Sequence, residues 1–119
     1  MSYTHDNKKP AILRNDPVDP DGTDWVYFSY GNWLRDNETI STHEGIVTGG
    51  TVETDSTYLG TLKDSHDVEF AEVYGVQFSV DAGVTSVTIT HRVSTITSGA
   101  VDLGRLDIDH SAIISVKAL

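Results

Sequence analysis

Three groups of side chains in this 119-residue chain have types and spacings that invite chemistry. The first group is acidic, because three aspartates surround Gly22 as carboxylates surround the glycine of a calcium loop. Aligned on Gly22, an EF-hand loop would take its first ligand from Pro17 and its bidentate glutamate from Phe28, so an EF-hand is excluded. The segment is typical of a turn, with an irregular calcium site as the weaker alternative. The aspartates concerned are Asp19, Asp21 and Asp24.

The second group combines carboxylates with a histidine near the C-terminus. Asp107 and Asp109 are two residues apart, so on a strand they share one face while His110 points to the other. That geometry divides the three and predicts a solvated acidic face with an inward histidine. His91 lies on the apolar face of its own predicted strand. We expect His91 and His110 to be cross-strand neighbours that form a pH-sensitive spot at about pH 6–7.

The remaining chemistry-bearing residues match no catalytic pattern. His43 and His66 are predicted in loops, and no histidines are spaced as in a zinc site. The serines lie outside any nucleophile motif, and Gly49-Gly50 is too short for a phosphate loop. The sequence therefore predicts no catalytic residues, no metal and no cofactor, and hence a protein that is not an enzyme.

The third group is aromatic. Trp25, Tyr27, Tyr30 and Trp33 lie within nine residues and include both tryptophans. They fit a surface on which sugar rings stack, as in a carbohydrate-binding module. The favoured interpretation is structural: Trp25 or Tyr27 packs between two sheets and Trp33 anchors a turn, with the indole N–H groups bonded locally.

Composition limits the classes of protein and partner. The net charge is −10, which opposes contacts with nucleic acid or with an anionic membrane surface. The chain has no cysteine, so disulfides and thiolate catalysis are excluded. No apolar run approaches the roughly 20 residues of a membrane helix. Its length fits a single domain.

The elements that must position these groups read as strands throughout. Alternating apolar residues, many of them β-branched, recur between turn signals, and no segment has helical periodicity. We predict an all-β, immunoglobulin-like β-sandwich with an extended N-terminal arm. The two longest alternating strands should pair as a hairpin. The predicted strands are 25–30, 39–47 (broken near Glu44-Gly45), 51–54, 58–62, 72–80, 84–96 and 103–116.

Residues 1–21 are assigned to the extended arm and residues 22–119 to the sandwich. All three prolines lie in the arm, and proline favours extended, unpaired backbone. The arm carries an apolar triplet between basic residues, which suits docking on the chain's own domain or on a neighbouring subunit. The candidate protein-interaction residues are Lys8, Lys9, Ala11, Ile12, Leu13 and Arg14.

The segment from Asp24 to Leu34, followed by Glu38-Thr39-Ile40-Ser41, resembles the start of the fiber-tail adaptor family of tailed bacteriophages. Val84 to Gly99 is similar to the strand and Thr/Ser-Gly turn before that family's last strand, which Arg105 would introduce. The resemblance covers about residues 16–116, and the acidic segment 64–72 departs from it. The residues expected to anchor the fold are Trp25, Trp33, Leu34 and Ile40.

The resemblance implies an immunoglobulin-like virion protein, present in several copies or a ring, which is assembled in the host cytoplasm. It would join the tail tube or the head–tail connector to the tail fibers through protein–protein contacts. The alternatives are a capsid decoration protein and a carbohydrate-binding module of a virion.

Overall fold

The computed structural model describes residues 9–98 and 104–118, which form seven strands and no helix. The all-β prediction is therefore confirmed. The strands are β1 (Ala11–Arg14), β2 (Thr23–Ser29), β3 (Glu38–Thr48), β4 (Gly50–Lys63), β5 (Glu69–Val80), β6 (Ser86–Thr97) and β7 (Ile108–Ser115).

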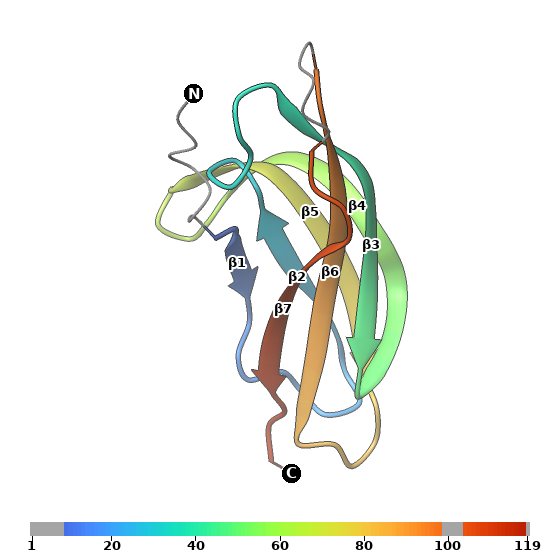
Figure 1. Ribbon diagram of the computed structural model, residues 1–119. Helices are drawn as coiled ribbons and strands as arrows, with labels where there is room; N and C mark the ends of the chain where they lie inside the picture. Colours follow the sequence, from blue (N-terminus) through green and yellow to red (C-terminus); the bar gives the residue numbers. More distant parts are fainter. Residues whose placement is uncertain (1–8, 99–103, 119) are drawn as a thin grey trace.

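The strands form two antiparallel sheets that pack face to face as a β-sandwich (Figure 1). One sheet has the order β1-β2-β5-β4 and the other the order β3-β6-β7. The chain passes from the second sheet to the first at Gly49, where φ is +88° and glycine is favoured. Strands β6 and β7 pair as the predicted hairpin, and His91 lies directly opposite His110 as expected.

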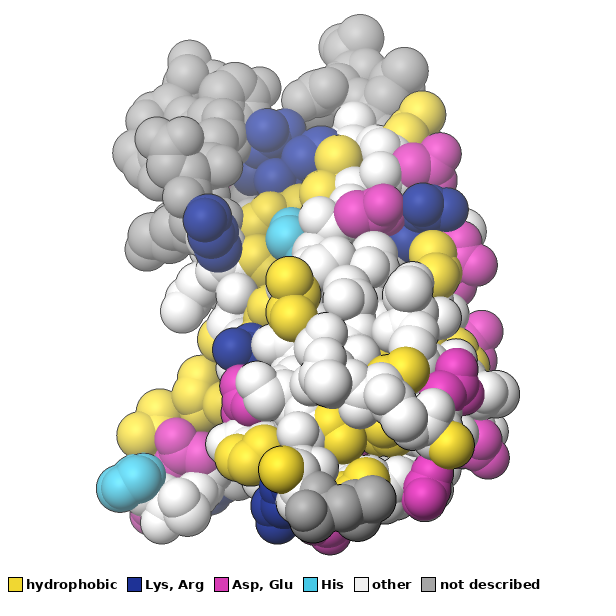
Figure 2. Space-filling view, turned by 90° about the horizontal axis from the view of Figure 1, so that it is seen from below, with side chains coloured by type: hydrophobic (Ala, Val, Ile, Leu, Met, Phe, Trp, Pro, Cys, Tyr) yellow, Lys and Arg dark blue, Asp and Glu magenta, His cyan; other side chains and the backbone are white. Residues whose placement is uncertain are grey.

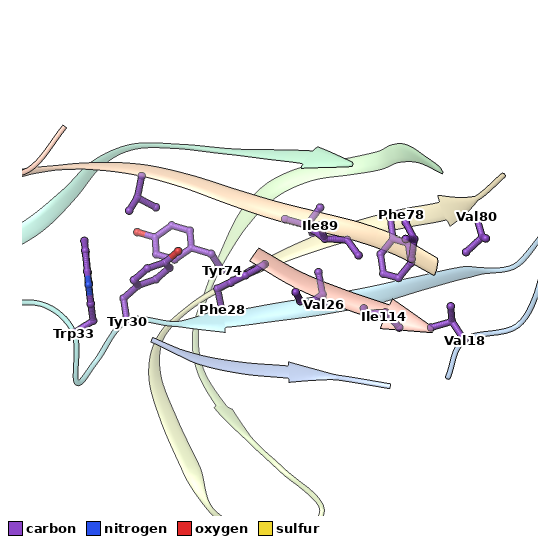
Figure 3. Packing of buried hydrophobic residues seen from close by; sticks show 14 residues of the cluster. Val18, Val26, Phe28, Tyr30, Trp33, Tyr74, Phe78, Val80, Ile89 and Ile114 are labelled. Atoms are coloured by element: carbon purple, nitrogen blue, oxygen red, sulfur yellow. The ribbon is translucent and has the colours of Figure 1, made fainter. Parts of the chain in front are cut away.

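The core follows the alternation of the sequence. In β2, Val26 and Phe28 point inward and are completely buried, and so is Tyr30 just beyond the strand. The inner face of β6 places Ile89 and His91 against them, as the period-2 pattern predicts. Figure 3 shows this row of side chains running between the sheets from Trp33 at one end to Val18 at the other.

Strand β3 is continuous from Glu38 to Thr48, so the predicted break near Glu44-Gly45 is wrong. Gly45 instead allows the two sheets to approach each other. A Cβ atom at this position would lie 2.9 Å from both methyl groups of Val76 on β5. The glycine reflects close packing between the layers and not a turn.

Strand β4 is likewise one strand from Gly50 to Lys63, where two short strands were predicted. Its register with β5 shifts four times, and Gly60 has φ +75° at one of these shifts. Bulges of this kind keep a strand paired while its alternation is interrupted. The period-2 pattern is therefore lost in the sequence although the strand persists.

The described part of the predicted arm belongs to the sandwich. Ala11–Arg14 is the edge strand β1 and pairs with β2 from Ala11↔Ser29 to Arg14↔Val26. Val18 is only 3% exposed and forms an isolated parallel bridge with Val116. Residues 1–8 of the predicted arm lie outside the described residues. From Ala11 onward, the structure differs from the boundary at residue 21, because this segment completes one sheet and one end of the core.

The close approach at Gly45 gives a first prediction. Replacing Gly45 with alanine should lower the free energy of unfolding by about 1–2 kcal/mol, because the new methyl group overpacks against Val76. In a Val76→Ala background the same change should cost much less, since the opposing methyl groups are gone. Urea unfolding of the four proteins measures this coupling. Equal costs in both backgrounds would show that contact with Val76 is not what requires a glycine here.

Candidate functional site

A buried ion pair closes one end of the sandwich. Arg105 donates two hydrogen bonds to the carboxylate of Glu38 through Nε and a terminal nitrogen, and a third to the carbonyl oxygen of Trp33. The guanidinium carbon lies 3.6 Å from the centre of the Trp33 ring. The side chain of Glu38 is 1% exposed and that of Arg105 is 14% exposed. We call this end, where Trp33, Glu38 and Arg105 meet, the Trp33 end.

Local backbone structure places both charges. The amide of Leu34 donates to the carbonyl of Tyr30 in a turn, and the Arg35 amide donates to the Glu38 carboxylate. Thr95 on β6 donates a further hydrogen bond to Glu38. Burial alone would raise the pKa of Glu38, but the hydrogen bonds from Arg105, Arg35 and Thr95 outweigh it and the pKa lies below its ordinary value. Glu38 is thus held ionised beside its counter-ion.

A chain of polar side chains runs through the interior beside this ion pair. The Tyr30 hydroxyl lies 2.7 Å from Nδ1 of His91 and 3.4 Å from Nδ1 of His110. On the other side of the ring, Nε2 of His91 lies 2.6 Å from Oγ of Ser56, which is also 2.6 Å from Nδ1 of His43. This row of hydrogen-bonded side chains reaches the surface at His43. His43 lies in β3 and not in the predicted loop.

Burial governs the protonation of the two paired histidines. It lowers the pKa of His91 to about 3, with smaller contributions in the same direction from His43 and His110. Burial also lowers the pKa of His110, and Arg105 adds to that effect. The cross-strand pairing was predicted, but its expected titration at about pH 6–7 was not correct for the folded protein, because both rings are desolvated.

The polar chain does not make a hydrolytic centre. Ser56 contacts two imidazoles, yet the second nitrogen of His91 contacts the Tyr30 hydroxyl, whose pKa is raised by burial, and not a carboxylate. His91 therefore lacks the hydrogen bond to a carboxylate that orients the histidine of a serine triad. The arrangement satisfies buried polar atoms. Among the described residues, no buried side-chain nitrogen or oxygen lacks a hydrogen-bond partner.

The two acidic groups of the sequence make hydrogen bonds and ion pairs within the chain. Asp109 pairs with Arg92 at 2.8 Å on the outer face of the three-stranded sheet, and His110 points inward, as the alternation predicts. Gly22 donates to the carbonyl of Asp19 in a turn, and Asp24 accepts from the amides of Trp25 and Asn15. No group of three or more His, Asp or Glu side chains suited to a metal occurs in residues 9–98 and 104–118.

The predicted interaction residues do not share one surface. Ile12 is partly buried and packs against the chain's own core. Leu13, opposite Tyr27, points to the outer face of the four-stranded sheet, and Arg14 is exposed at the end of β1. Lys9 is exposed at the start of β1, and Lys8 lies outside the described residues.

The four aromatic residues considered for sugar stacking also do not share one surface. Tyr30 and Trp33 are buried, and their rings meet edge to face at 5.3 Å. Trp25 and Tyr27 lie on the outer face of the four-stranded sheet with their rings parallel. Trp25 is thus not between the sheets and does not anchor the core, whereas Trp33, Leu34 and Ile40 do contribute to it.

Exposed apolar side chains and a groove mark the Trp33 end. Leu106 is 74% exposed, Ile96 is 55% exposed and Val68 is 49% exposed. Val68 also lines a groove of about 310 Å³ with Lys9 and Asn32. Figure 1 shows the β2–β3 connection, the β4–β5 turn and the start of β1 at this end. Several exposed apolar side chains at one end of a domain make that end a candidate surface for contacts with another protein.

Part of the negative charge lies on the outer surface of β3 and β4. In Figure 2, acidic side chains gather along the right-hand margin, and uncharged polar groups and backbone cover much of the centre. Exposed carboxylates such as Glu44, Glu53 and Asp55 lie in the neighbouring strands β3 and β4. The acidity is consistent with solubility through self-repulsion.

Comparison with known proteins adds no assignment. No protein-family model matches the chain, and no curated protein is found to be similar to it. In the described part of the chain there is also no helix able to cross a membrane.

Proposed function

We propose that this chain is a non-enzymatic structural protein of a bacteriophage tail that links the tail tube or connector to tail fibers. The single observation that carries the proposal is that its family-like residues meet in space. Trp33, Glu38 and Arg105 come from separate parts of the resemblance, and they form one hydrogen-bonded cluster. A set of residues with a shared structural role is a better basis for a family assignment than the same residues scattered over the surface.

The strand order supports the immunoglobulin-like part of the proposal. Named A to G along the chain, the strands have the order A-B-E-D in one sheet and C-F-G in the other. This is the arrangement of seven-stranded immunoglobulin constant-type domains. Fold alone does not establish function, so the assignment to a virion rests on the resemblance and not on the topology.

The proposed mode of action is protein–protein contact in the virion. The exposed apolar residues at the Trp33 end dock on other tail proteins, and several copies form a ring around the tail. The sandwich acts as a rigid spacer, since its two sheets share one continuous core. Assembly would take place in the host cytoplasm.

Fractionation of virions tests the location. Particles whose genome encodes the chain are separated into capsid shells and tails, and the protein is detected in each fraction by mass spectrometry. We expect it in the tails and not in the shells. Its presence on tail-free shells would instead support the alternative of a capsid decoration protein and would contradict the adaptor function.

A matched pair of variants tests the docking end. We expect Leu106→Asp to abolish incorporation into tails while leaving urea unfolding within about 0.5 kcal/mol of the wild type, because the side chain is 74% exposed. Ile113→Asp is the control, since Ile113 is 66% exposed in β7 away from this end. Complementation of phage lacking the gene provides the readout. Normal incorporation of Leu106→Asp would refute the proposed docking end.

A further inference from the structure

A second groove lies on the outer face of the four-stranded sheet. It has a volume of about 370 Å³, which falls within the usual range for small-molecule sites. Leu13 of β1 and the ring pair of β2 form one part of its lining, and Leu62 and Lys63 at the end of β4 form the other. Residues nearly 50 positions apart in the sequence therefore build it together.

Two parallel aromatic rings line this groove. Trp25 and Tyr27 occupy alternate positions of β2, so both point outward, and their ring centres lie 6.0 Å apart with planes inclined by 2°. Gly75 of β5 leaves room for the Trp25 ring, because a Cβ atom there would lie 3.1 Å from two of its atoms and equally close to Leu59. Packing against β5 at Gly75 thus restricts the orientation of the indole before any ligand arrives, which lowers the entropic cost of binding.

Polar groups surround the rings, and their charges balance. The lining contains two cations, Arg14 and Lys63, and two carboxylates, Asp24 and Asp64. The amide of Asn15 donates to the Asp24 carboxylate at 3.2 Å, and the Asp64 carboxylate accepts from two backbone amides of its turn. These contacts orient side chains that are able to donate to or accept from hydroxyl groups.

We propose that the Trp25 groove binds a neutral oligosaccharide. The apolar face of a sugar ring would lie on the fixed aromatic pair, and its hydroxyl groups would bond to Asn15, Asp24 and Lys63. A balanced set of charges suits an uncharged ligand that has many hydroxyl groups. A nucleic acid is disfavoured by the net charge of −10. This inference goes beyond the proposed tail function and does not depend on it, because neither Leu106 nor Ile96 lines the groove.

A glycan array tests the proposal with the full-length protein. The probes are neutral oligosaccharides built from glucose, galactose, mannose and N-acetylhexosamines, and hits are titrated by isothermal calorimetry. We expect at least one such glycan to bind, and Trp25→Ala to weaken its binding about tenfold or more, the loss expected for one aromatic stacking contact. Asn15→Ala, an exposed change, should weaken binding independently of the aromatic pair.

The matched control is Tyr58→Ala, which removes another aromatic side chain from the same sheet, 52% exposed and outside the groove lining. It should leave glycan affinity unchanged, and circular dichroism should show that all variants are folded. Absence of glycan binding by the folded wild type would overturn the proposal. Binding that survives both Trp25→Ala and Asn15→Ala would also overturn it, whether or not the protein is found on tails.

Discussion

Replacing Arg105 with alanine is expected to lower the free energy of unfolding by about 3–5 kcal/mol at neutral pH. The change leaves the carboxylate of Glu38, whose side chain is 1% exposed, without its counter-ion. It also removes the hydrogen bond to the carbonyl of Trp33 and the cation lying over the indole. Urea unfolding followed by tryptophan fluorescence measures the loss.

Two further variants separate the buried charge from ordinary side-chain loss. Arg92→Ala removes an exposed arginine that pairs with Asp109 and Glu44, and it should cost less than about 1 kcal/mol. Adding Glu38→Gln to Arg105→Ala should recover part of the stability, because the unpaired charge is then gone. A double variant less stable than Arg105→Ala alone would contradict the proposed role of the ion pair.

Acidification is expected to destabilise the fold through His91. The folded pKa of about 3 lies below the ordinary value of 6.5, so between these values the unfolded chain binds a proton that the folded protein does not. Stability is then complete above pH 6.5 and falls as the pH drops towards 3. Between pH 7.5 and pH 4.5 this one group should cost roughly 2–3 kcal/mol, at 1.36 kcal/mol for each of about two pH units.

The variant His91→Gln isolates this effect. Glutamine keeps donors and acceptors near Tyr30 and Ser56 but does not titrate, so the unfolding free energy should fall between pH 7.5 and 4.5 by roughly 2–3 kcal/mol less than in the wild type. His66→Gln, in the exposed β4–β5 turn, is the control and should follow the wild-type profile. Parallel profiles for His91→Gln and the wild type would show that His91 is not a buried neutral group.

Strands with a regularly alternating buried face were predictable from the sequence, and the edge strands β3 and β4 were predicted only in part. The alternation in 72–80 and 84–96 placed Phe78, Ile89 and His91 inward, because burial on one face imposes a period of two. In β3 and β4 that signal is weak, since both are edge strands with polar residues on both faces. Gly45 then resembled a break, although the glycine is needed where Val76 approaches.

The candidate site was predictable only in part for a related reason. Both faces of β2 carry large apolar residues, so alternation could not decide whether Trp25 or Val26 points inward. The resemblance singled out Trp33, Glu38 and Arg105 one by one, but their contact joins residues 67 positions apart and appears only in the fold. Ser56 had no signal at all, because its role depends on the two histidines that β3 and β6 bring to it.

An electron cryomicroscopy map of the virion would test the central claim most directly. If the chain is a tail adaptor, several symmetric copies of its seven-stranded sandwich should lie at the junction of tail and fibers. In each copy, the Trp33 end should face a neighbouring protein. Density for the sandwich on the capsid lattice, with none on the tail, would contradict the proposed function.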